Sequence, residues 1–169
     1  MSGAPGSRRL GEFMIKTTIA AALAASCLYA GPAAAGALPD GGATAQEIAK
    51  VLQDKGYKAE IGKDSEGDPM ISSAAEGANF QVLFYGCKSG RCNSIQFSAA
   101  YDLPKGMELQ KINQWNVKTR FGRAFLDEVN DPFVQMDVDL EFGSTTESVA
   151  NNLETWILVF REFRKFVDQ

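Results

Sequence analysis

The clearest structural pattern in this chain is the stretch NFQVLFYGCKSGRCNSIQFSAAY, residues 79–101. Its two halves, Asn79–Tyr85 and Ser94–Tyr101, alternate apolar with polar residues and are rich in aromatic side chains, which is typical of half-buried β-strands. Residues 88–91 between them have the length and the glycine of a hairpin loop. The stretch therefore predicts an antiparallel β-hairpin.

Two cysteines, Cys87 and Cys92, flank this loop. Cysteines placed so face each other across the strands within disulfide reach, and closing so short a loop stabilises a fold by about 2 kcal/mol on the chain-entropy model. Two thiolates without a histidine or a further cysteine cannot complete a zinc shell, and C-x4-C is not the C-x-x-C redox motif. We predict a structural disulfide; a redox-active pair and free thiols are the alternatives.

The elements on either side of the hairpin extend the sheet. Thr44 and Glu47 form a capping box for a helix that ends at Gly56. In the strand over Phe133–Glu141, apolar residues alternate with Gln135, Asp137, Asp139 and Glu141, which indicates a sheet with one wet face. The remaining predicted elements are strands over Tyr57–Gly62, Met70–Ser73 and Phe121–Leu126, a helix over Met107–Lys118 with Leu109, Ile112 and Trp115 inward, and a long helix opened by a capping box at Ser144–Glu147, with Val149, Leu153, Trp156, Phe160, Phe163 and Val167 on one seam.

The predicted order is α-β-β-β-β-α-β-β-α. Runs of strands interrupted by single helices, without β-α-β alternation, favour an α+β fold: an antiparallel sheet of about six strands with helices on one face. The chain has no G-x-G-x-x-G or Walker A loop, so nucleotide binding by those routes is not expected.

The first 35 residues have the pattern of a processing signal. From Met14, a basic residue, Lys16, precedes an apolar run and a small-residue cleavage site ending at Ala35, as in a Sec signal peptide. The run is too short for a membrane span. The alternatives are a twin-arginine signal at Arg8-Arg9 and lipidation of Cys27. We divide the chain into 1–13, a cloning scar or a mis-set upstream start, 14–35, the signal peptide, 36–43, a flexible lead-in, and 44–169, the folded domain.

Composition excludes several functional classes. Loss of Arg8, Arg9, Lys16 and Glu12 with the leader changes the net charge from −4 to −6, which argues against a nucleic-acid partner. The chain has no histidine, so Ser-His-Asp and Cys-His catalysis, H-E-x-x-H zinc sites and haem with an axial histidine are absent. We expect no enzyme, no cofactor and no metal, and a periplasmic or secreted location.

Acidic clusters occur in two places. Asp64, Glu66 and Asp68 resemble half a calcium loop, but position 12 is Ala75. The segments 66–71 and 129–134 share an Asp-Pro after Gly or Asn, which favours turn chemistry over a cation site. Asp137 and Asp139 lie two apart on one strand, and such a pair is typical of a solvated face rather than of a glycosidase cleft.

Two further groups are candidate surfaces. Trp115, Asn116, Arg120 and Arg123 could form a stacking and cationic pocket for an anionic group or a partner carboxylate. The alternative is a core tryptophan with arginines paired to the acidic strand. The last helix is apolar nearly all round, so it either lies deep in the chain or meets a second copy, with Leu158 at the dimer surface.

The residues also resemble a known family. Eight segments carry the resemblance: 56–60, 68–71, 79–80, 84–87, 92–98, 113–116, 120–124 and 131–132. They resemble the YbjN domain, a bacterial sensory transduction regulator family. The most specific of them is the Trp-Asn…Arg-Phe-Gly-Arg-Ala block. The resemblance covers about residues 44–167 and implies a fold similar to type III secretion chaperones, an α+β unit that commonly dimerises. It implies no catalytic residues.

Together these inferences predict an exported, non-enzymatic binding, chaperone-like or regulatory module that holds a protein or peptide partner. The leader and the cysteine pair set the chain apart from cytoplasmic members of the family, so cytoplasmic roles are not carried over. The alternative function is a small-ligand or cation sensor that uses the 64–68 turn or the Arg120 and Arg123 region.

Overall fold

The structure is a computed structural model that describes residues 1, 3 and 36–168. The chain divides into two units, Met1–Ala33 and Ala34–Gln169, and every helix and strand given below lies in the second. The predicted signal peptide, its Cys27 alternative and the upstream extension lie outside the described residues, apart from residues 1 and 3.

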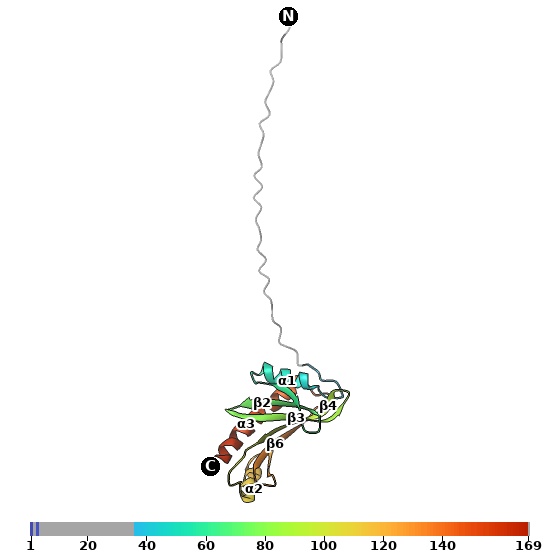
Figure 1. Ribbon diagram of the computed structural model, residues 1–169. Helices are drawn as coiled ribbons and strands as arrows, with labels where there is room; N and C mark the ends of the chain where they lie inside the picture. The colour runs from blue at the N-terminus through green and yellow to red at the C-terminus, as the bar shows by residue number, and fades with distance from the viewer. Residues whose placement is uncertain (2, 4–35, 169) are drawn as a thin grey trace. The chain divides into compact units, whose positions relative to one another are not determined.

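Six antiparallel strands form one open sheet in the order β1-β2-β3-β4-β6-β5 (Figure 1). Three helices complete the predicted order α-β-β-β-β-α-β-β-α, and the α+β fold class is confirmed. The strands are β1 (Glu60–Lys63), β2 (Pro69–Ala75), β3 (Ala78–Lys88), β4 (Arg91–Ala100), β5 (Arg123–Leu126) and β6 (Pro132–Asp139), and the helices are α1 (Ala45–Asp54), α2 (Leu109–Lys118) and α3 (Thr146–Val167).

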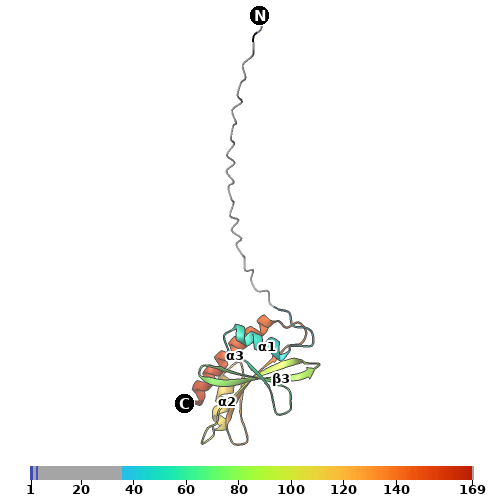
Figure 2. The ribbon, with the colours of Figure 1, turned by 45° about the horizontal axis from the view of Figure 1, so that its top comes forward.

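The core lies between one face of the sheet and α3. Register pairs Ile95 of β4 with Val138 of β6, and both side chains are buried on this face. Trp156 of α3 stacks on Phe97 with ring centroids 5.7 Å apart and meets Phe80 edge-on at 5.9 Å. Such aromatic pairs stabilise beyond their buried area. Figures 1 and 2 show α1 beside the N-terminal half of α3 and α2 near its C-terminal end.

The long helix α3 is buried on more than its predicted seam. Ile157 and Val159 lie off the seam, yet they are 8% and 6% exposed, whereas Leu158 is 53% exposed. Burial within the chain therefore accounts for Ile157 and Val159, whereas Phe166 and the seam residue Val167 are only partly buried and Leu158 stays exposed. Seam residues that the structure buries are Val149, Leu153, Trp156, Phe160 and Phe163.

Two local predictions about the helices were wrong. The cap of α3 is Thr145, whose hydroxyl accepts from the backbone N–H of Ser148 at 3.0 Å, so Ser144 and Glu147 do not form a capping box. Leu109 was expected inward, but it is 71% exposed because α2 begins at this residue and Met107, just before the helix, packs against the core. The capping box of α1 at Thr44 and Glu47 is confirmed.

Residues 36–43, predicted to be a flexible lead-in, are bound to the domain. Leu38 is 5% exposed and Ala43 is fully buried. The backbone N–H of Ala43 donates to the carbonyl of Cys92 at 3.0 Å, and the N–H of Cys92 donates back to Ala43 at 2.8 Å. At the other end, Gly36 donates to the hydroxyl of Thr146 at 3.0 Å. Isolated apolar residues, Leu38 and Ala43, attach this segment to the domain. Its sequence therefore shows neither helical nor strand periodicity.

The hairpin forms as predicted, with a tighter turn. Cys87 and Cys92 are register partners and are joined by a disulfide. The strands run on past the cysteines, so the loop has two residues, Ser89 and Gly90, both with positive φ (52° and 82°). Two-residue loops of this backbone type match the twist of the flanking strands.

Candidate functional site

The structure separates the four residues, Trp115, Asn116, Arg120 and Arg123, that the sequence groups as a candidate pocket. The amide of Asn116 donates to the carbonyl of Ala124 at 2.9 Å and accepts from its backbone N–H at 2.8 Å, so it fastens β5 to α2. Arg123 points to the open sheet face, where it donates to Gln135 at 2.8 Å and lies over the ring of Phe125. Neither residue lines the groove that contains Trp115.

Trp115 and Arg120 do lie together, in a groove between α2 and α3 that also includes Leu158. The groove has a volume of about 660 Å³, within the usual range of about 300–1,000 Å³ for ligand sites. It is lined by Lys111, Gln114, Trp115, Lys118, Thr119, Arg120, Phe121, Leu158, Val159, Glu162, Lys165 and Phe166. We call these residues the α2–α3 groove.

The loop after α2 forms one wall of the groove because a glycine lets it approach α3 closely. Gly122 has a positive φ of 75°, and a Cβ there would lie 2.8 Å from Cγ1 of buried Val159. Any residue with a Cβ at this position would push the loop away from α3. Phe121 then stands at the rim, 48% exposed, with the guanidinium of Arg120 5.0 Å from its ring centre.

The groove combines an apolar floor with a cationic rim. Trp115 packs edge-on against Phe163 at 5.0 Å and is 6% exposed, so it is fixed in place at the floor. The rim carries four cations, Lys111, Lys118, Arg120 and Lys165. Its acid, Glu162, is paired with Lys165 at 2.9 Å and with Arg161 at 3.5 Å. Hydrogen bonding to Lys165 lowers the pKa of Glu162, so this carboxylate stays ionised at neutral pH.

The alternative interpretation, in which the arginines pair with the acidic strand, is wrong. Among the described residues, neither Arg120 nor Arg123 forms an ion pair with the acids of β6. One of those acids, Asp137, instead accepts from the amide of Gln96 at 2.6 Å, and Gln96 is 5% exposed. Asp139 accepts from the backbone N–H of Glu141 at 2.9 Å. These acids are thus committed to neighbouring amides on the wet face.

Both acidic turns are built in the same way. One carboxylate oxygen of Asp64 accepts the backbone N–H groups of Glu66 and Asp68, both at 2.9 Å. Asp127 does the same for Val129 and Asp131, at 3.0 and 2.8 Å. The predicted turn chemistry explains both clusters. No group of three or more metal-ligating side chains occurs among residues 36–168.

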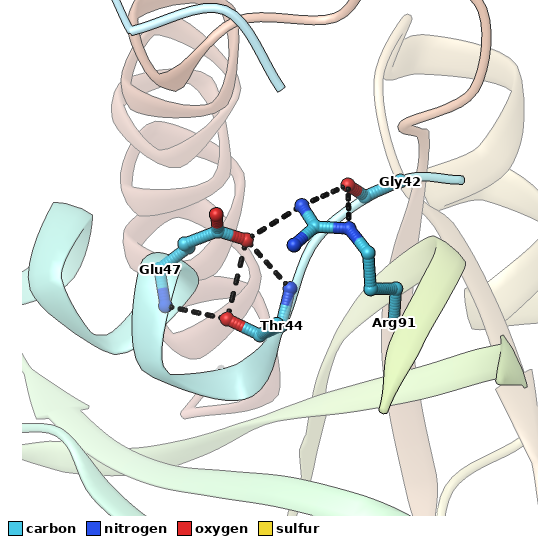
Figure 3. Close-up of polar contacts among 4 residues, drawn as sticks. All are labelled: Gly42, Thr44, Glu47 and Arg91. Atoms are coloured by element: carbon cyan, nitrogen blue, oxygen red, sulfur yellow. Dashed lines mark hydrogen bonds and ion pairs between the residues drawn. The ribbon is translucent and has the colours of Figure 1, made fainter. Parts of the chain in front are cut away.

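A cluster that the sequence did not point to joins the lead-in to the hairpin (Figure 3). The guanidinium of Arg91 donates to the carbonyl of Gly42 at 2.6 and 3.1 Å and to the carboxylate of Glu47 at 2.8 Å. Thr44 donates its backbone N–H to the same carboxylate at 2.8 Å. The sequence identifies Glu47 as a capping residue, but no local pattern connects Glu47 to Arg91, which is 44 residues away.

The charge state of this cluster is set by hydrogen bonding. Burial raises the pKa of Glu47, but bonds from the backbone of Thr44, from Arg91 and from the Thr44 hydroxyl outweigh burial and lower this pKa overall. The cluster is therefore an ionised network whose hydrogen bonds tie the lead-in, the start of α1 and the hairpin together. We assign it a structural role.

Comparison with known proteins identifies a family for this chain. The YbjN family model, described as "Putative bacterial sensory transduction regulator", matches residues 44–169. No curated protein and no solved structure matches. None of the helices within residues 36–168 has the length and apolar character needed to cross a membrane.

Proposed function

This chain belongs to the YbjN family, and from that premise we propose that it is an exported, non-enzymatic regulatory module that acts by binding a protein or peptide partner. The observation that supports this most directly is the α2–α3 groove, where exposed Phe121 and Leu158 stand beside a fixed tryptophan. Exposed apolar side chains next to a buried aromatic anchor are typical of protein-binding sites.

Export is the second part of the proposal. It rests on the basic, apolar and small-residue series from Met14 to Ala35. Intact-mass analysis of the protein from its own host tests it: we expect a chain that starts at Gly36. A mass that retains the leader contradicts export with cleavage, and a diacylglyceryl mass on Cys27 replaces it with the lipoprotein alternative.

Partner binding is tested by capture from an envelope extract with the tagged full chain. The groove variant replaces Phe121 and Leu158 by serine; both side chains are about half exposed, so the fold should persist. The control variant replaces Val129 and Phe142, 69% and 83% exposed, by serine outside the groove. We expect the groove variant to lose captured proteins that the parent and the control retain. Equal capture by all three would refute groove binding.

The sensor alternative has no supporting observation in the acidic turns. In each turn one carboxylate oxygen, that of Asp64 or of Asp127, accepts two backbone N–H groups and so serves the turn. Residues 36–168 contain no group of three or more metal-ligating side chains.

A further inference from the structure

We propose that the α2–α3 groove takes acidic peptide segments that insert apolar side chains. This inference rests on the proposed function and specifies the chemistry of the partner. Two properties of the groove support the inference: the positive charge of its rim, and the apolar character of its floor and of the exposed side chains Phe121 and Leu158.

The uneven distribution of charge within the domain indicates the charge of the partner. Residues 36–169 carry a net charge of −6, yet the groove carries four cations and one acid. That acid, Glu162, is already paired with Lys165. Lys111, Lys118 and Arg120 form no ion pair among the described residues, so their charge is directed to solvent. A cationic patch on an acidic domain attracts anionic segments. It also repels the same cationic patch on a second copy of the domain.

The apolar surface excludes a simple anion site. Phe121 and Leu158 are 48% and 53% exposed, and Trp115, Val159 and Phe166 lie beneath them. A small anion would leave this apolar surface in water, whereas a segment with leucine or phenylalanine side chains would cover it. Both properties are satisfied together by a segment that alternates acidic with large apolar residues.

A second copy of this chain fits the groove poorly. A two-fold contact centred on Leu158 sets the same surface of both copies face to face. The four rim cations of one copy would then lie in the same interface as the four of the other, and like charges brought together disfavour such a contact. The rim thus favours a different, acidic partner over the dimer expected from the family resemblance.

The probe is a tryptophan-free peptide of acidic and apolar residues, Ac-GEELFEEFLEEG-NH2, added to the full chain. The chain has two tryptophans, and Trp156 is fully buried in the core, so a change of fluorescence reports on Trp115 at the groove floor. One matched peptide has lysine for every glutamate, and another has serine for every leucine and phenylalanine. We expect saturable binding of the probe and at least about tenfold weaker binding of both matched peptides.

Charge-reversal variants connect binding to the groove. Lys118→Glu with Arg120→Glu reverses two rim charges, while Lys63→Glu with Lys88→Glu makes the same change of charge on exposed strand residues outside the groove. We expect the first pair to weaken probe binding about tenfold and the second to leave it within about twofold. Raising the salt from about 0.01 M to about 1 M, which shortens the Debye length from about 30 Å to about 3 Å, should also weaken it.

Several results would overturn the inference. They are equal binding of the lysine peptide, equal binding of the serine peptide, and equal effects of the two charge-reversal pairs. Light scattering that shows a dimer of the parent but a monomer of the serine variant at Phe121 and Leu158 would assign the groove to a second copy instead. If the probe fails but capture of a partner still depends on Phe121 and Leu158, the acidic chemistry is wrong and the proposed function stands.

Discussion

Replacing Gly42 by alanine tests whether the lead-in is an integral part of the domain. Gly42 has a positive φ of 85°, and a Cβ at this position would overlap the carbonyl oxygen of Cys92. The obstacle is backbone of a buried strand, so it cannot give way as a flexible side chain would. We expect the alanine variant to fold while residues 36–43 leave their place.

The size of the effect follows from what the lead-in buries. Undocking exposes Leu38, worth about 1.5–3 kcal/mol, and breaks the two backbone hydrogen bonds between Ala43 and Cys92, worth about 1 kcal/mol each. The further bonds that Leu38, Gly36 and Gly42 would lose are offset by the chain entropy that the freed segment regains, so we expect a loss of about 5 kcal/mol. Gly67→Ala is the matched control: its φ is 94° and nothing lies within 4 Å of a Cβ there. It should cost about 1 kcal/mol for the left-handed backbone alone.

Urea unfolding of the parent and both variants gives the change in the free energy of unfolding that each variant causes. Amide exchange locates the change: the N–H groups of Ala43 and Cys92, which donate to each other's carbonyls, should lose protection in Gly42→Ala and keep it in Gly67→Ala. Equal destabilisation by the two variants, with both amides still protected, would show that our account of lead-in docking is wrong.

Three further predictions concern the disulfide and two titrating groups. Reduction of the bond between Cys87 and Cys92 should lower the free energy of unfolding by about 2 kcal/mol without weakening partner capture; urea curves with and without reductant measure this, and coincident curves would contradict it. The pKa of Glu47 is lowered by folding, so its stabilisation is present above the ordinary value of 4.5 and disappears as the pH falls through the folded value. Glu47→Gln should accordingly be less stable than the parent at pH 7 and approach it in acid; a pH-independent difference would exclude this role. Burial raises the pKa of Tyr101 from 10.0 to about 12, so the stability linked to it is present below pH 10 and is lost as the pH rises toward 12. Tyr101→Phe should remove that loss, seen as a shallower fall of melting temperature in base, and parallel curves would refute it.

Features that depend on neighbours within about four residues could be predicted from the sequence. The alternation along Phe133–Glu141 defined both faces of β6, because successive side chains of a strand point to opposite sides. The capping box of Thr44 and Glu47 spans a single helical turn. The shared Asp-Pro turns at 64–69 and 127–132 depend on one aspartate and the backbone directly after it.

Which residues share a surface became clear from the packing of distant elements. Arg120 and Arg123 are three residues apart, but one lies in a loop against α3 and the other on a strand facing away from it, so they serve different faces. Trp115 and Leu158 meet in one groove although 43 positions separate them. Local propensity sets the shape of each element, whereas burial and charge at a site depend on which distant elements pack against it, and that packing is a property of the whole chain.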